Sequence, residues 1–120
     1  NYFRFAYTYL QAEKDDSQSP RIFIDKYYDE IDLAYVRSLT SSVKAGLGYL
    51  YRGSIYKDSA RATSPVRRKD RLYHYSGYIS YDLTPSTGLI LQYEYYDNRS
   101  NYTPSDYTKE VFTAGVYIYL

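Results

Sequence analysis

Apolar and polar residues alternate along six separate segments of the chain. In the first segment, Phe3, Phe5, Tyr7 and Tyr9 alternate with more polar neighbours over about ten residues. The same period of two returns around residues 30–35, 43–52, 73–82, 89–95 and 112–120. This period is the pattern of a β-strand whose two faces meet different environments. No segment has a helical period of useful length, so the sequence predicts an all-β antiparallel meander of about six strands.

Short and long connections alternate strictly between these segments. Short polar turns are expected at residues 40–42 and 84–87, and long polar loops at 12–26, 53–71 and 98–108. In an up-and-down meander this order gathers the long loops at one end of the sheet and the short turns at the other. Outer-membrane barrels have this asymmetry, with short periplasmic turns and longer extracellular loops. We therefore expect the long loops on the cell surface.

Composition excludes two other classes of protein. A mean hydropathy of -0.61 with 24% charged residues excludes a helical transmembrane protein. A hydrophobic content of 44%, including 20 Tyr, argues against a disordered chain, because it provides ample surface to bury. A low mean hydropathy does not exclude a membrane β-barrel, because only every second residue of its strands meets lipid.

One face of each predicted strand carries no charge along its middle, and this face is expected to meet lipid. Tyr73 and Tyr81 lie on that face of one strand, eight residues or about 26 Å apart. This separation fits two aromatic girdles, one on each side of an apolar band. The predicted lipid-facing residues are Phe3, Phe5, Ile31, Leu33, Leu47, Leu91, Val116 and Ile118. The alternative is a soluble lipocalin-like ligand-binding barrel with the tyrosines in its core.

The opposite face carries charges of both signs, as the lumen of a water-filled pore does. The predicted lumen-lining residues are Arg4, Glu30, Asp32, Lys44, Arg52, His74, Gln92 and Glu94. These groups indicate a pore or export channel. They could instead pair across strands and plug the lumen, which would make the protein a structural envelope barrel without transport activity.

The last eight residues of the chain resemble the C-terminal targeting signal of Gram-negative outer-membrane proteins. The matching positions are Thr113, Gly115, Ile118 and Leu120, although Leu120 stands where Phe is usual. The segment 78–120 further resembles the last strands of porin-like barrels, including those of surface lipoprotein assembly modifiers. The resemblance implies the bacterial outer membrane as location, lipid as surroundings, and recognition by the barrel assembly machinery.

Six strands are too few for a single-chain barrel, for which about eight is the minimum. We therefore expect these strands to be the C-terminal part of a larger barrel whose other strands are missing from this chain. The alternative is a barrel shared between several copies.

A basic segment lies within one of the predicted long loops. Its cations are Arg61, Arg67, Arg68, Lys69 and Arg71. On the cell surface their natural anionic neighbour is the phosphate of lipopolysaccharide, which Arg binds bidentately; the alternative is a solvated loop. A net charge of +1 and the lack of stacking aromatics in this segment argue against binding of nucleic acid.

Catalytic and metal sites are not expected. His74, Ser76 and Asp82 share a face, but Asp82 is about 26 Å from His74 along the strand, too far for a catalytic relay. One His and no Cys leave no transition-metal set, and no cofactor motif is present. The pairs Asp15-Asp16 and Asp97-Asn98 could ligate calcium in loops, but such groups are usually solvated.

Overall fold

The computed structural model describes residues 1–12, 26–56, 68–101 and 103–118, which form six strands and one short helical turn. The strands follow the chain as β1 (Tyr2–Ala12), β2 (Lys26–Ser38), β3 (Val43–Tyr56), β4 (Lys69–Thr84), β5 (Thr87–Ser100) and β6 (Tyr107–Ile118). A 3₁₀ turn, η1 (Thr103–Ser105), lies between β5 and β6. The predicted number of strands is confirmed.

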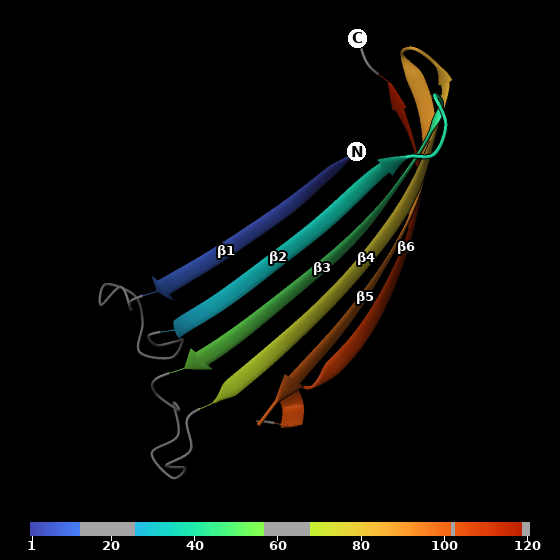
Figure 1. Ribbon diagram of the computed structural model, residues 1–120. Helices are drawn as coiled ribbons and strands as arrows, with labels where there is room; N and C mark the ends of the chain where they lie inside the picture. The colour runs from blue at the N-terminus through green and yellow to red at the C-terminus, as the bar shows by residue number, and fades with distance from the viewer. Residues whose placement is uncertain (13–25, 57–67, 102, 119–120) are drawn as a thin grey trace, which may run out of the picture.

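All six strands form one antiparallel sheet in the order β1-β2-β3-β4-β5-β6 (Figure 1). Each strand pairs with its neighbours in sequence, so the sheet is the predicted up-and-down meander. The sheet is open, because among the described strands β1 pairs only with β2 and β6 only with β5. The connections 39–42 and 85–86 lie at one end of the sheet, here called the turn end; the opposite end is called the loop end.

Threonine hydroxyls shape both short turns. Thr40 Oγ1 accepts hydrogen bonds from the amides of Ser42 and Val43, and Thr84 Oγ1 accepts one from the amide of Ser86. Such local bonds favour a tight reversal of the chain. The second turn is shorter than predicted, because Thr84 and Thr87 pair with each other as strand ends.

The strands are longer at the loop end than the sequence pattern predicted. β2 begins at Lys26, β3 continues to Tyr56 and β4 already begins at Lys69, so the predicted loop 53–71 is wrong at both ends. The predicted loop 98–108 also loses residues to β5 and β6. Backbone pairing extends past the last apolar residue, because hydrogen bonding between strands does not require apolar side chains.

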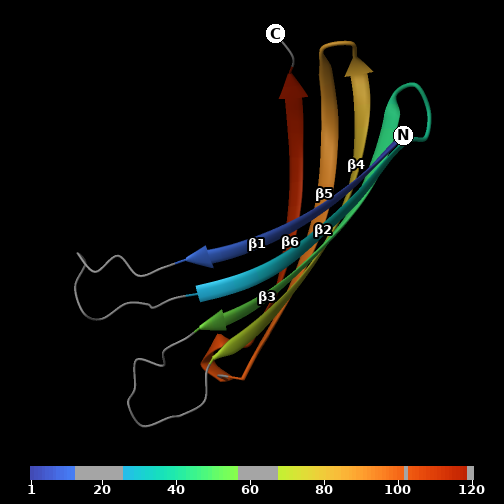
Figure 2. The same cartoon turned by 60° about the vertical axis from the view of Figure 1, so that its left-hand side comes forward.

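The sheet coils strongly, so that in Figure 2 the direction of β1 differs widely from that of β6. The coiled sheet has no hydrophobic core within the described residues. Its radius of gyration is 19.3 Å, against the roughly 14 Å expected of a compact domain of this length. The strands are held by backbone pairing and by contacts across each face, and neither face is covered by another layer.

Candidate functional site

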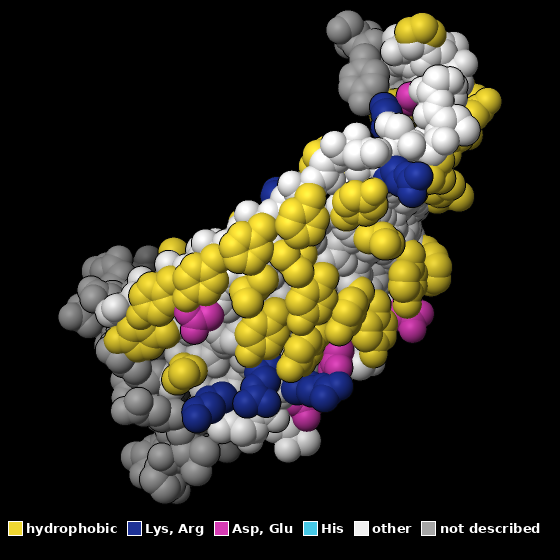
Figure 3. Space-filling model, viewed as in Figure 1, with side chains coloured by type: hydrophobic (Ala, Val, Ile, Leu, Met, Phe, Trp, Pro, Cys, Tyr) yellow, Lys and Arg dark blue, Asp and Glu magenta, His cyan; other side chains and the backbone are white. Residues whose placement is uncertain are grey.

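All eight residues predicted to face lipid lie on one face of the sheet, called here the apolar face. The register places them on the same face of neighbouring strands. Phe5 stands opposite Leu33, and Val116 stands opposite Leu89, which shares its face of β5 with Leu91. Six of these side chains are exposed, with exposed fractions of 69% for Leu47 and 59% for Leu91, and Ile31 and Leu33 are half-buried. Figure 3 shows this face as a continuous field of hydrophobic side chains over several strands.

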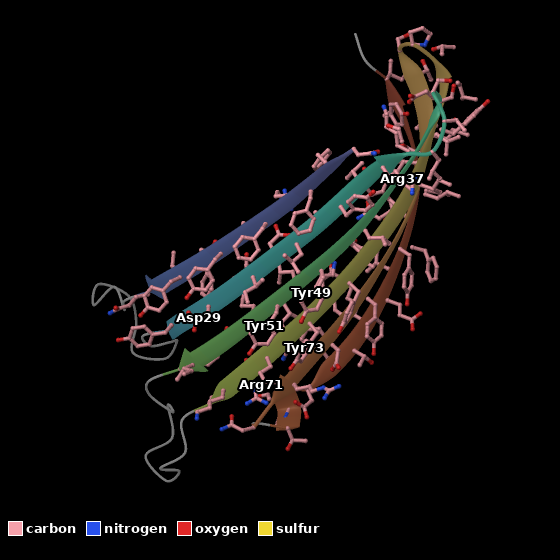
Figure 4. The ribbon with its side chains drawn as sticks, in the orientation of Figure 1. Asp29, Arg37, Tyr49, Tyr51, Arg71 and Tyr73 are labelled. Carbon is pink, nitrogen blue, oxygen red and sulfur yellow. The ribbon has the colours of Figure 1, made fainter. Side chains whose placement is uncertain are left out.

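Charges lie only at the margins of the apolar face. On β2 the margins are Asp29 at the loop end and Arg37 at the turn end; on β4 the loop-end margin is Arg71 (Figure 4). On β5 and β6 the loop-end charges of this face are Asp97 and Glu110. On each described strand, no residue of the apolar face between its margins is Asp, Glu, Lys or Arg. The charge-free stretch of β2 is about 26 Å along the strand.

The loop-end margin runs obliquely across the strands. Glu110 is the loop-end charge of β6. The residues directly opposite it on β5, β4 and β3 in turn lead to Leu33 on β2, which lies four residues from Asp29 toward the turn end. The margin therefore shifts by four residues between β2 and β6, an average of one residue per strand-to-strand step, although Arg71 of β4 still stands in the row of Asp29. With rises of about 3.3 Å per residue and spacings of about 4.8 Å between strands, the strands tilt by about 35° from the normal to this margin. Strands of transmembrane barrels tilt by about 35 to 45°.

Aromatic pairs join neighbouring strands on the apolar face. Tyr49 and Tyr75 have ring centroids 5.2 Å apart, and Tyr51 and Tyr73 have centroids 5.4 Å apart. Both pairs stand directly opposite each other in the register of β3 and β4. Such cross-strand pairs stabilise the sheet by roughly 0.2 to 1 kcal/mol each.

All eight residues predicted to line a lumen lie on the opposite face, called here the polar face. This face is the more crowded one, since every buried residue in the described part of the chain lies on it: Gly46, Ser54, Asp70, Ser80, Gly88 and Asn98. Aromatic rings add to the crowding. The ring of Tyr78 lies across Gly46, where a Cβ atom would overlap it, and the ring of Tyr117 lies across Gly88 in the same way. Crowding on one face is expected where side chains converge on the concave side of a coiled sheet.

Side-chain contacts on the polar face join the neighbouring strands from β1 through β5, and three of these contacts are ion pairs. The Arg4 guanidinium donates to Asp32 at 2.7 Å, and Arg52 Nε donates to Glu30 at 2.7 Å. The third ion pair is Lys44 with Asp82 at 3.4 Å, and Nε2 of His74 lies within hydrogen-bond distance of Glu94 Oε1, at 3.1 Å. The sequence predicted the charges, and the register adds their partners.

His74 belongs to a small cluster on β4 and β5. Its ring stacks on that of Tyr96, with centroids 4.2 Å apart and planes 7° apart, and Glu94 also accepts a hydrogen bond from the Tyr96 hydroxyl at 3.1 Å. Asp82 is engaged elsewhere, by Lys44 and by the hydroxyl of Tyr117. His74 and Asp82 are therefore committed to different partners, and neither contacts the other in a catalytic relay.

A second cluster surrounds Asp70 at the loop end, beyond the Arg71 margin. Arg68 donates to Asp70 at 2.5 Å, and the Ser100 hydroxyl donates to it at 2.5 Å. Asp70 is only 7% exposed. This burial would raise the pKa of Asp70, but the hydrogen bonds from Arg68 and Ser100 hold that pKa below its ordinary value.

Two hollows lie on the polar face within the described residues. One, of about 300 Å³, is lined by Arg4, Asp32, His74, Ser76 and Tyr78 among others. The other, of about 360 Å³, lies over the Asp70 cluster. Polar and aromatic side chains line both hollows together with aliphatic ones, such as Val36 and Leu50 in the first and Leu72 in the second.

The predicted basic loop is not a single cluster. Arg61 and Arg67 lie outside the described residues. Arg68 is paired with Asp70, whereas Lys69 and Arg71 belong to β4 and lie on the apolar face. The prediction that Lys69 and Arg71 belong to a loop is therefore wrong, because β4 begins earlier than the sequence pattern indicated.

The remaining predicted positions fall partly in the sheet. Thr113, Gly115 and Ile118 lie on β6, an edge strand, and Leu120 lies outside the described residues. Asp15 and Asp16 also lie outside them. Asp97 is paired with Arg99, and Asn98 donates to the carbonyl of Ser105 from the opposite face. Over residues 1–12, 26–56, 68–101 and 103–118, no three His, Cys, Asp or Glu side chains gather as metal ligands would.

Comparisons of the chain with models of protein families, with curated proteins and with solved structures found no match. The described part of the chain also contains no helix that is long and apolar enough to span a membrane.

Proposed function

We propose that this chain forms part of the wall of a β-barrel in the bacterial outer membrane, with its apolar face toward lipid and its polar face toward a water-filled passage. The observation that carries the proposal is the inversion of the two faces: the more exposed face is apolar and the more crowded face is polar. In a soluble barrel the apolar side chains would fill the interior. The lipocalin-like alternative is not favoured for this reason.

The oblique margin of the apolar face gives independent support. A membrane surface is flat, so a boundary between charged and uncharged residues that follows it must cross tilted strands obliquely. The tilt of about 35° falls at the lower limit for membrane barrels, and it shortens the charge-free stretch of β2 to roughly 22 Å along the membrane normal. An outward apolar band about 25 Å tall is typical of such barrels.

We propose transport or export of a hydrophilic solute as the activity of the complete barrel. Charged side chains are tolerated at membrane depth chiefly where water or a partner reaches them, and the polar face supplies both. The test is conductance: the purified complete barrel in a planar bilayer should carry ions in steady steps. A barrel that inserts into the bilayer but conducts no ions would contradict the proposed transport activity.

One observation favours a second candidate, a structural barrel without transport. Three cross-strand ion pairs and the contact of His74 with Glu94 engage every predicted lumen residue except Gln92. In this candidate, the pairs stiffen a filled interior. The same bilayer recording separates the two functions, because a filled interior conducts no ions.

A further inference from the structure

Three cations meet at one corner of the apolar face without enough anions to balance them. Lys69 and Arg71 lie two residues apart on β4, and Arg99 stands directly opposite Arg71 on β5. Among the described residues, only Asp97 compensates this corner, through its 2.9 Å ion pair with Arg99. Within the described residues, no ion pair engages the side chain of Lys69 or Arg71.

The opposition of Arg71 and Arg99 costs stability in the sheet alone. Like charges directly opposite each other on neighbouring strands destabilise the pairing. Arg99 is anchored in this position, because its guanidinium lies over the ring of Tyr73 at 5.6 Å from the centroid and contacts Asp97. An anion between the two guanidinium groups would convert the repulsion into two charge-assisted contacts.

The surroundings of this corner indicate what kind of anion fits. The cations border the uncovered apolar face on one side, as Figure 3 shows along its lower margin, and the loop end on the other. Tyr73 and Tyr75 continue the face directly from Arg71. A molecule that covers both regions has an anionic group joined to an apolar chain, which describes an anionic lipid.

We propose that Lys69, Arg71 and Arg99 form a binding site for the phosphate group of a membrane lipid, whose acyl chains lie along the neighbouring apolar face. The site rests on the proposed membrane location, since lipid reaches it only there. It is distinct from the predicted loop cluster, because its three members belong to strands and share one face.

Lipid retention tests the site directly. The chain is folded in micelles of a zwitterionic detergent with a trace of equimolar phosphatidylglycerol and phosphatidylcholine, and the retained lipid is identified by native mass spectrometry. The wild type should retain phosphatidylglycerol in preference. Arg71→Gln with Arg99→Gln should lower this retention by about 25-fold, since each cation near an anionic lipid contributes about fivefold.

The matched control is Arg37→Gln with Lys109→Gln, which removes the same net charge away from the corner. It should retain phosphatidylglycerol as the wild type does. An equal loss in both double variants would overturn the site in favour of a general charge effect. Full displacement of the lipid by inorganic phosphate, at an ionic strength matched with chloride, would overturn the lipid in favour of a free anion.

A stability measurement distinguishes loss of lipid binding from a general loss of folding in the variants. In zwitterionic micelles Arg71→Gln should leave the sheet as stable as the wild type or more stable, because the variant removes a repulsion. In micelles with phosphatidylglycerol the same substitution should destabilise it. A change in stability of the same sign in the two kinds of micelle would contradict the site. Failure of the wild type to enter any micelle would instead count against the membrane location.

Discussion

Tyr78 lies with its ring across Gly46, the residue directly opposite it on β3. The glycine is required by this contact and not by backbone conformation, because any Cβ at position 46 would overlap the ring. We expect Gly46→Ala to displace Tyr78 and to cost about 1 to 3 kcal/mol of unfolding free energy, as overpacking does. Denaturant titration of the folded chain measures this cost.

Gly77 offers the matched control. It lies on the apolar face, where a Cβ would meet the Leu47 side chain at 3.6 Å and the carbonyl oxygen of Gly46 at 3.9 Å, both ordinary van der Waals contacts. Gly77→Ala should therefore leave stability unchanged or raise it slightly, since alanine loses less backbone entropy than glycine on folding. Equal losses at both positions would show that the crowding of the polar face is unimportant.

Leu91→Arg tests the environment of the apolar face. Leu91 is 59% exposed, so in water an arginine there should cost almost nothing. If lipid surrounds this face, the substitution should cost about 2 to 4 kcal/mol near the midplane of the bilayer. Its neighbour Gln92 lies on the polar face, and Gln92→Arg should cost much less in the same vesicles. Comparable small costs at both positions would count against lipid contact.

The two faces could be predicted from the sequence because charge follows parity along the strands. Arg4, Glu30 and Glu94 fall on one face once the period of two is recognised, and Leu33 and Leu91 fall on the other. The partners could not be predicted in this way. The pairing of His74 with Glu94 depends on the register of β4 against β5, which a one-residue shift would alter for every side chain.

The ends of the strands were also beyond the sequence pattern. Lys69, Asp70 and Arg71 look like a polar loop, yet they continue β4, because the backbone groups of this segment pair with β3 and β5. The Asp70 cluster was missed for the same reason. An acid followed by Arg in an expected loop gives no signal of burial, and the contact with Ser100 spans thirty residues of chain.

Glu94→Lys tests the role of the polar face in ion passage. Reversal of this charge beside the aqueous path should shift the preference of the complete barrel from cations toward anions, because the local field selects the permeating ion. Reversal potentials in a salt gradient across a planar bilayer measure the shift. Glu110→Lys is the control on the apolar face and should leave the preference unchanged. A Glu94 variant that cannot fold would instead assign this residue to a structural network.

Asp70 makes stability depend on pH in a definite direction. Its hydrogen bonds lower its pKa in the folded state, so its contribution to stability is present above the pKa of the unfolded chain and is lost as the pH falls through the folded pKa. Asp70→Asn removes this contribution. The difference in unfolding free energy between wild type and variant should therefore be largest near neutral pH and shrink in acid. A difference that grows in acid would mean that burial dominates the pKa of Asp70.

The arrangement of the two faces is tested most directly by spin labels at two adjacent positions. The chain has no cysteine, so Leu91→Cys and Gln92→Cys each introduce a single labelling site, on opposite faces of β5. Collision rates with oxygen, which concentrates in lipid, and with a water-soluble nickel chelate are then measured in vesicles. We predict that the label at position 91 meets oxygen and the label at 92 meets the chelate. Access of the chelate to position 91 equal to that at position 92 would contradict a lipid-facing apolar surface.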